Sequence, residues 1–245
     1  MPPLLIAAFL WLVSVSNAFA ITDSFQDCEQ DTNVELKVIA CSDIINRGTA
    51  RNEFLAGAFA GRGNAYAEKG DLDRAISDFD SAIELNPKDA EMHTWRGEAY
   101  ADKGDLDRAI SDFSRAIELD PYDTEAYTER GEAYTKKGDF DRAIADHSLA
   151  IKYEQKHAEA YAGRAWALLK AGKAAEGLPD IERALVLERN DPDALNIRGH
   201  IFEAMGRKDQ AIADYHKALT IKPSLEASKE GLKRLGVPED QGPPD

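Results

Sequence analysis

Histidines, cysteines and carboxylates are the residues of this 245-residue chain that could do chemistry. Imidazoles beside carboxylates can transfer protons or hold a metal ion, and both roles need the groups at short, fixed spacings. The histidines here form no H-x-x-x-H or H-E-x-x-H arrangement. They are dispersed as His93, His147, His157, His200 and His216. The sequence therefore predicts a non-enzymatic protein with no catalytic residue, no metal site and no cofactor.

Cys28 and Cys41 are the only two cysteines of the chain. An oxidising compartment favours a disulfide between them, and two cysteines with no nearby histidine are too few ligands for zinc. The loop that the bond would close is short, which corresponds to roughly 2–3 kcal/mol in the chain-entropy model. We therefore predict a disulfide between Cys28 and Cys41.

The N-terminus supports an oxidising compartment. Residues 1–20 contain no charged side chain, and 4–13 form an unbroken apolar run. Ala18-Phe19-Ala20 has the small-x-small pattern of a signal peptidase site, and the run is about half the length that spans a membrane. This predicts a signal peptide cleaved after Ala20 and a periplasmic or secreted protein, not inserted in the membrane. An uncleaved anchor is the alternative, because no Lys or Arg precedes the run.

The rest of the chain is organised by a period of 34 residues. Arg-Gly-x-Ala-Tyr, intact or altered, begins at Arg62, Arg96, Arg130, Arg164 and Arg198. A second block, Lys-Gly-Asp-x-Asp-Arg-Ala-Ile, keeps the same step at 69–76, 103–110 and 137–144. Each unit therefore holds two helical patterns separated by a Gly-Asp break. The glycine suits the end of the first helix, and the aspartate suits the N-cap of the second.

The sequence closely resembles the tetratricopeptide repeat family, whose 34-residue units are helical hairpins. The resemblance implies an all-α fold, a right-handed superhelical α-solenoid in which stacking buries the apolar faces. Five repeats are expected at 56–89, 90–123, 124–157, 158–191 and 192–225. Before them we expect a degenerate half-repeat with the disulfide at 21–55; after them, a solvating helix at 226–236 and a disordered tail at 237–245.

Two charged columns recur in all five units, with an arginine on the first helix and an aspartate 16 residues later on the second. We predict an Arg–Asp pair that joins the two helices of each unit, and solvated charge on two faces is the alternative. The first helix also carries glycine at 63, 97, 131 and 199. In the family's geometry these glycines are expected to face alanines of the second helix at 75, 109, 143 and 211.

The charge of the chain limits its partners. Asp and Glu number 45 against 30 Lys and Arg, so the formal net charge is −15. Such a surplus disfavours nucleic acid and anionic membranes as partners. Residues 90–135 alone carry 12 acidic and 5 basic side chains. This stretch favours a basic protein or extended peptide, although an acidic wall can also serve only solubility.

The resemblance implies that function comes from binding on the concave wall formed by the first helices. The residues expected there are Asn64, Glu91, Glu98, Asp102, Glu125, Glu129, Glu132, Trp166, Asn196 and His200. Trp166 is a potential hot spot of an interface or else a packing residue. The sequence thus predicts a non-catalytic protein–protein interaction scaffold of the bacterial cell envelope; it leaves the oligomeric state open and favours a monomer. A self-associating structural protein and an accessory subunit of an envelope enzyme or export complex are the alternatives.

Overall fold

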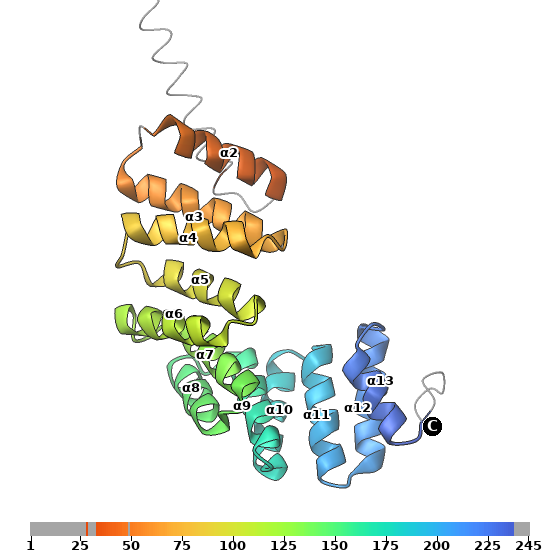
Figure 1. Ribbon diagram of the computed structural model, residues 1–245. Helices are drawn as coiled ribbons and strands as arrows, with labels where there is room; N and C mark the ends of the chain where they lie inside the picture. The colour runs from red at the N-terminus through yellow and green to blue at the C-terminus, as the bar shows by residue number, and fades with distance from the viewer. Residues whose placement is uncertain (1–27, 29–32, 49, 238–245) are drawn as a thin grey trace, which may run out of the picture. The chain divides into compact units, whose positions relative to one another are not determined.

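The computed structural model describes residues 28, 33–48 and 50–237 (Figure 1). The expected signal peptide and all but the first residue of the expected tail lie outside the described residues. Within them the regular structure is entirely helical, with twelve α-helices and no strand. The helices are α2 (Val34–Arg47), α3 (Asn52–Glu68), α4 (Leu72–Leu85), α5 (Ala90–Asp102), α6 (Leu106–Leu119), α7 (Thr124–Lys137), α8 (Phe140–Tyr153), α9 (Ala158–Lys170), α10 (Ala174–Leu187), α11 (Pro192–Ala204), α12 (Lys208–Ile221) and α13 (Glu226–Arg234).

The Gly-Asp breaks end and begin helices as the sequence predicts. Gly70 follows α3 with a φ of 74°, a left-handed conformation that a side chain would strain. The carboxylate of Asp71 then accepts a hydrogen bond from the backbone N–H of Arg74 in the first turn of α4. Asp105 and Asp139 cap α6 and α8 in the same way. The local chemistry of the repeat therefore sets these helix boundaries.

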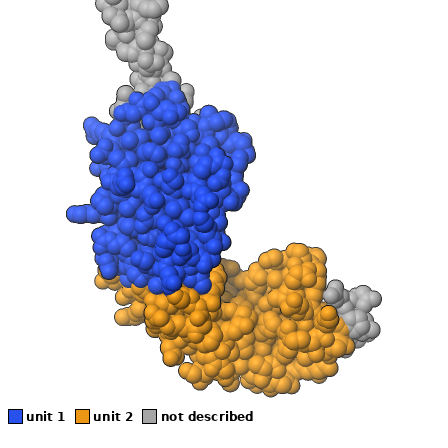
Figure 2. Space-filling view, viewed as in Figure 1, with its two compact units in different colours: residues 1–120 blue, residues 121–245 orange. Residues whose placement is uncertain are grey.

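The helices are grouped in two compact units, residues 1–120 and 121–245, which Figure 2 shows in different colours. In the first unit, α2 to α6 pack each against the next. In the second unit, α7 to α13 do the same, and α7, α9 and α11 also contact one another in sequence. The second unit thus contains a row of first helices, α7–α9–α11, whose side chains share one face.

The glycines of the first helices lie against rings of the second helices. A Cβ placed on Gly97 would come within 2.7 Å of the Phe113 ring, and one on Gly63 would meet the Phe79 ring equally closely. In the fourth repeat the two columns meet as the sequence predicts, since a Cβ on Gly177 would lie 2.9 Å from the backbone oxygen of Ala165, whereas the atoms nearest to Gly63 and Gly97 belong to rings. The reason is size, because the ring fills the space that a missing side chain opens in the paired helix.

The ring contact makes Gly97 intolerant of even one methyl group. We expect Gly97→Ala to lower the free energy of unfolding by about 1–2 kcal/mol, because the Phe113 ring must move out of a well-packed position. The matched control is Gly57→Ala, since a Cβ on Gly57 of α3 meets nothing within 4 Å. This control should stabilise the protein by about 0.5–1 kcal/mol, the gain of Ala over Gly in a helix. Denaturant titration measures both; equal effects would contradict the packing argument.

The predicted Arg–Asp pairs are confirmed in all five 34-residue repeats. Each guanidinium donates two hydrogen bonds to one carboxylate, as in Arg96 to Asp112 at 2.8 and 2.6 Å. The paired aspartates are nearly buried, with Asp112 only 6% exposed. The Arg96 guanidinium holds the pKa of Asp112 below its usual range although burial alone would raise it. The other four pairs are Arg62–Asp78, Arg130–Asp146, Arg164–Asp180 and Arg198–Asp214.

The cysteines lie at the start of the first unit and are joined by a disulfide, with Cys41 of α2 fully buried. The two sulfur atoms would be 3.3 and 3.4 Å from a Cβ on Gly61, so the disulfide packs closely against α3. The bond thus ties Cys28 to α2, and this pair packs against the first helix of the α3–α4 hairpin. Throughout the part of the chain that the structure describes, each helix is too short or too polar to cross a membrane.

Candidate functional site

The row of first helices in the second unit borders a cavity of about 600 Å³. Side chains from α7, α9 and α11 form most of its walls, and the segment between α10 and α11 closes one side. The lining residues are Glu132, Thr135, Lys136, His147, Glu159, Ala162, Gly163, Trp166, Glu188, Asp191, Asp193, Ala194, Asn196 and Ile197. A cavity of this size suits a peptide side chain or a small ligand.

The charged groups of this cavity are mostly anionic, because five of its lining residues are Asp or Glu and one is Lys. Asp193 pairs with Lys222 at 3.2 Å, and Glu132 lies 3.8 Å from Lys136. Among the described residues, Glu159 and Glu188 have no cationic partner. Shielding from water raises the pKa of Glu132, and Lys136 opposes this effect while the Glu159 carboxylate adds to it. The cavity therefore concentrates negative charge that the protein itself only partly neutralises.

His147 of α8 lies in the wall of this cavity and is fully buried. Neither its Nδ1 nor its Nε2 has a hydrogen-bond partner among the described residues. The ring lies between Gly131 and Gly163, since a Cβ on either glycine would collide with it. Burial lowers the pKa of His147 to about 4, so the imidazole is neutral near pH 7, with one donor and one acceptor unused.

Trp166 separates this cavity from a neighbouring one of about 520 Å³ on the same unit. In the neighbouring cavity the Lys170 ammonium lies 4.3 Å from the centroid of the Trp166 ring, and the His200 ring lies 5.7 Å away. His200 in turn belongs to a network in which Tyr215 and Arg234 both donate to Glu203. Trp166 thus has a cationic neighbour in one cavity and a mostly acidic environment in the other.

The structure brings some of the residues expected on the concave wall together. Glu132, Trp166 and Asn196 line the larger cavity, and His200 lies beside Trp166 in the neighbouring one. Asn196 is buried, and its Oδ1 accepts a hydrogen bond from Ser228 Oγ at 2.9 Å. The remaining expected residues line neither cavity: Glu125 and Glu129 on α7 of the second unit, and Asn64, Glu91, Glu98 and Asp102 on α3 and α5 of the first.

Sequence reasoning missed His147, Gly163 and the acidic groups Glu159, Glu188 and Asp191. The net charge of 90–135 drew attention to another stretch, whereas most of the carboxylates of the cavity come from 159–193. A signal was nevertheless present in the repeat. His147 stands at the position that other repeats fill with Phe79, Phe113 and Tyr215. Trp166 stands at the position that they fill with Asn64, Glu98, Glu132 and His200. Departures from the repeat thus identify the cavity better than the local charge does.

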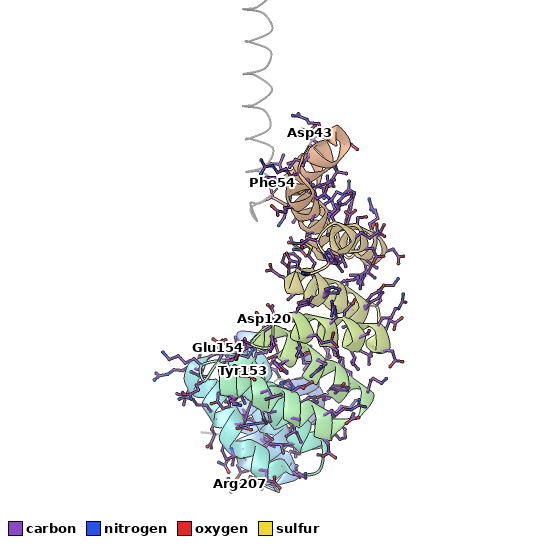
Figure 3. The ribbon with its side chains drawn as sticks, turned by 90° about the vertical axis from the view of Figure 1, so that its left-hand side faces the viewer. Asp43, Phe54, Asp120, Tyr153, Glu154 and Arg207 are labelled. Atoms are coloured by element: carbon purple, nitrogen blue, oxygen red, sulfur yellow. A yellow bond between two sulfur atoms is a disulfide. The ribbon has the colours of Figure 1, made fainter. Side chains whose placement is uncertain are left out.

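A separate aromatic cluster lies near the start of the second unit. The ring of Tyr122, which is 71% exposed, meets the ring of Tyr153 edge-on with centroids 5.2 Å apart. Tyr153 ends α8 and is followed by Glu154, and Figure 3 labels both. Tyr127 packs against Tyr153 from α7 at 5.9 Å. Because none of these rings lines the cavity, the cluster is separate from it, with Tyr122 exposed at the surface and Tyr127 buried beneath.

Helical hairpins with a 34-residue step, joined by Arg–Asp pairs and bearing a cavity on their first helices, define a helical-repeat binding protein. Three profiles described as "Tetratricopeptide repeat" match residues 61–124, 100–167 and 192–225, together more than half of the chain. The chain belongs to the tetratricopeptide repeat family. Such repeat proteins are generally non-catalytic scaffolds that bind proteins or peptides on extended surfaces.

Solved structures share this fold. A tetratricopeptide repeat protein from Parabacteroides merdae is 23% identical, with a TM-score of 0.64 over 83% of this chain and 78% of its own. YrrB, described as a TPR protein with an unusual peptide-binding site, is 19% identical, with a TM-score of 0.58 over 79% of this chain and 98% of YrrB. A chain of the APC/C hetero-tetramer Cut9–Hcn1 is 20% identical, with a TM-score of 0.73 over 82% of this chain and 39% of its own. At these identities the likeness shows the fold alone. No curated protein matches the chain significantly in sequence.

Proposed function

We propose that this protein is a non-catalytic scaffold of the bacterial cell envelope that binds a protein or an extended peptide on the face formed by α7, α9 and α11. The observation that carries the proposal is the cavity of about 600 Å³ on that face, bordered by three successive first helices. Extended surfaces of stacked repeats suit long, flexible partners, and a cavity within such a surface can hold an anchoring side chain. YrrB, which has the same fold, is described as having a peptide-binding site.

The envelope location rests on two features. The apolar, uncharged segment at 1–20 ends in a small-x-small pattern, which directs export and cleavage after Ala20. Cys28 and Cys41 are paired in a disulfide, a bond that persists in oxidising compartments. A periplasmic or secreted protein with these properties meets its partner outside the cytoplasm.

The proposal is tested by affinity capture from an envelope extract of the source bacterium, with the purified protein as bait. We expect the double variant Glu132→Lys/Trp166→Ala to capture at least tenfold less of the partner than the wild type does. The variant reverses a charge and removes an aromatic wall of the cavity. The bound proteins are quantified by mass spectrometry.

The matched control is Glu176→Lys/Asp209→Lys, which changes two exposed acidic residues of the second helices α10 and α12. Neither residue lines the cavity, so the control should retain the partner. A partner that survives the cavity variant and is lost with the control would place binding on the opposite face and refute the proposed site.

A further inference from the structure

Three residues that break the repeat pattern converge on the larger cavity. His147 stands at the repeat position that holds Phe79 and Phe113 in earlier repeats. Trp166 stands at the position that holds Glu132 in the preceding repeat. Gly163 stands where the flanking repeats have Glu129 and Ile197, and the His147 ring fills the space beside it, since a Cβ on Gly163 would lie 2.4 Å from that ring. In a chain that otherwise repeats itself, residues that depart from the pattern at one place indicate a specific role for that place.

The chemistry of the cavity is complementary to a cation. The five carboxylates of its lining outnumber the single ammonium of Lys136, and Glu159 and Glu188 have no cationic partner among the described residues. A positive group between Glu132 and Glu159 would relieve the repulsion that these two carboxylates exert on each other. Acidic side chains alone also occur on solvated surfaces, so the occupant must be argued from other groups as well.

His147 supplies an independent indication of a ligand. Its imidazole is fully buried in the wall of the cavity, and both ring nitrogens lack a hydrogen-bond partner within the described structure. A buried polar group without a partner is unfavourable by about 1–3 kcal/mol, and such groups are rare in folded proteins. Because the ring has no exposed surface in this structure, a nitrogen of His147 accepts a hydrogen bond from a cationic N–H group in the cavity once the ring turns toward it.

The Trp166 ring provides the remaining wall. Tryptophan is the best aromatic partner for cations, and the 4.3 Å approach of Lys170 shows that this ring is accessible to one. Lys170 lines the neighbouring cavity and not the larger one. Lys170 therefore does not occupy the larger cavity. The side of the Trp166 ring that borders this cavity is available to another cation.

We propose that this cavity is a binding pocket for the guanidinium group of an arginine side chain in an extended peptide. A planar guanidinium stacks on an aromatic ring and offers five N–H donors, which suits several carboxylates and one imidazole acceptor better than a compact ammonium does. The pocket lies on the face shared by α7, α9 and α11, along which the peptide on either side of the arginine can continue. This inference rests on the proposed function and specifies the chemistry of its anchor.

The test uses three probes: the peptide acetyl-Gly-Gly-Arg-Gly-Gly-amide, the same peptide with citrulline for arginine, and spermidine. Binding is followed by NMR on the Trp166 indole N–H resonance, which is assigned from its loss in Trp166→Phe. The arginine peptide should shift this resonance saturably, with a dissociation constant on the order of 1 mM. Citrulline has the shape of arginine without its charge, so its peptide should bind at least tenfold more weakly.

Variants of the pocket complete the test. Glu132→Gln/Glu159→Gln should weaken binding of the arginine peptide at least tenfold, and His147→Phe about fivefold. The control Glu176→Gln/Asp209→Asn removes two exposed carboxylates of the same unit outside the pocket and should leave the affinity unchanged.

Equal shifts with the citrulline peptide, no shift with the arginine peptide, or full affinity in the double pocket variant would overturn the proposal. A response to spermidine without one to the arginine peptide would overturn the peptide as the source of the cation. The capture experiment distinguishes this failure from that of the scaffold itself. A partner that depends on Glu132 and Trp166, together with no arginine binding, would leave the scaffold standing and remove only the arginine pocket.

Discussion

Replacing Asp214 by alanine is expected to lower the free energy of unfolding of the second unit by about 3 kcal/mol, because it leaves a half-buried guanidinium without its anion. The two carboxylate oxygens of Asp214 each accept a hydrogen bond from Arg198 at 2.7 Å, and Asp214 is 5% exposed. The hydrogen bonds to Asp214 raise the pKa of Arg198, so the guanidinium remains charged in the intact pair. Denaturant titration followed by circular dichroism measures the loss.

The control replaces both members of the pair. Arg198→Met/Asp214→Val stays close to the combined volume of the pair and removes both charges, so its free energy of unfolding should lie within about 1 kcal/mol of the wild type. This result would show that the large effect of Asp214→Ala comes from an unpaired charge and not from lost packing. If Asp214→Ala were as stable as the wild type, the pair would be no more than solvated charge on two faces.

Replacing His147 by phenylalanine is expected to have an effect of the opposite sign. The variant places at this position the phenylalanine that other repeats have as Phe79 and Phe113. It also removes two buried nitrogens that have no hydrogen-bond partner among the described residues. We expect the free energy of unfolding to rise by about 2 kcal/mol near pH 7.5, since each unsatisfied buried polar group costs about 1–3 kcal/mol. Denaturant titration at this pH checks the gain, and a loss of stability would show that the His147 imidazole makes favourable hydrogen bonds in the folded protein.

The gain should grow as the pH falls. Burial lowers the pKa of His147 from 6.5 to about 4, and the charges of Arg164 and His157 act in the same direction. Between these pH values the unfolded chain binds the proton better than the folded one, so acid destabilises the fold. The wild type should lose about 1.4 kcal/mol per pH unit through His147, or roughly 3 kcal/mol between pH 6.5 and 4. His147→Phe should lack this contribution.

A reciprocal variant serves as the control for the pH dependence. Phe113 occupies the equivalent place in the first unit and is fully buried against Gly97. Phe113→His should therefore destabilise the first unit and give it an acid-dependent loss of stability that the wild-type unit lacks at this position. If His147→Phe and the wild type lost stability in parallel from pH 6.5 to 4, the imidazole would not be the group that responds.

The gain in stability expected for His147→Phe is linked to the loss of arginine binding expected for the same variant. A phenylalanine at this position improves the core but cannot accept a hydrogen bond in the cavity wall. We therefore interpret His147 as a residue that lowers the stability of the second unit while equipping it for binding. Such a trade between stability and function is common where a binding site interrupts an otherwise regular core.

The fold followed from the sequence because its determinants are local and repeated. Gly70 and Asp71 end one helix and start the next through backbone conformation and a single hydrogen bond, neither of which depends on distant parts of the chain. The Arg–Asp pairs were predictable for a related reason. A residue on the first helix and one 16 positions later face each other in every hairpin, so one geometric argument covers five pairs.

The candidate site was predicted only in part. Glu132, Trp166 and Asn196 were expected on the binding face from their positions in the first helices, and they line the cavity. Glu159 and Asp191 were not expected, because net charge along a stretch of sequence does not show which carboxylates converge in space. The contact of glycines with rings was also missed, since the pattern shows small residues but not the side chains that fill the space beside them.

The sequence by itself determined the helical hairpins, their 34-residue step and the ion pairs within them, because short-range chemistry repeated five times has one consistent solution. Only the tertiary structure decided that His147, Gly163 and Trp166 meet at one acidic cavity. Their convergence depends on α8 packing against α9 and on α7, α9 and α11 lying in a row. Contacts between neighbouring repeats of the second unit therefore bring three separate departures from the repeat pattern together in one site.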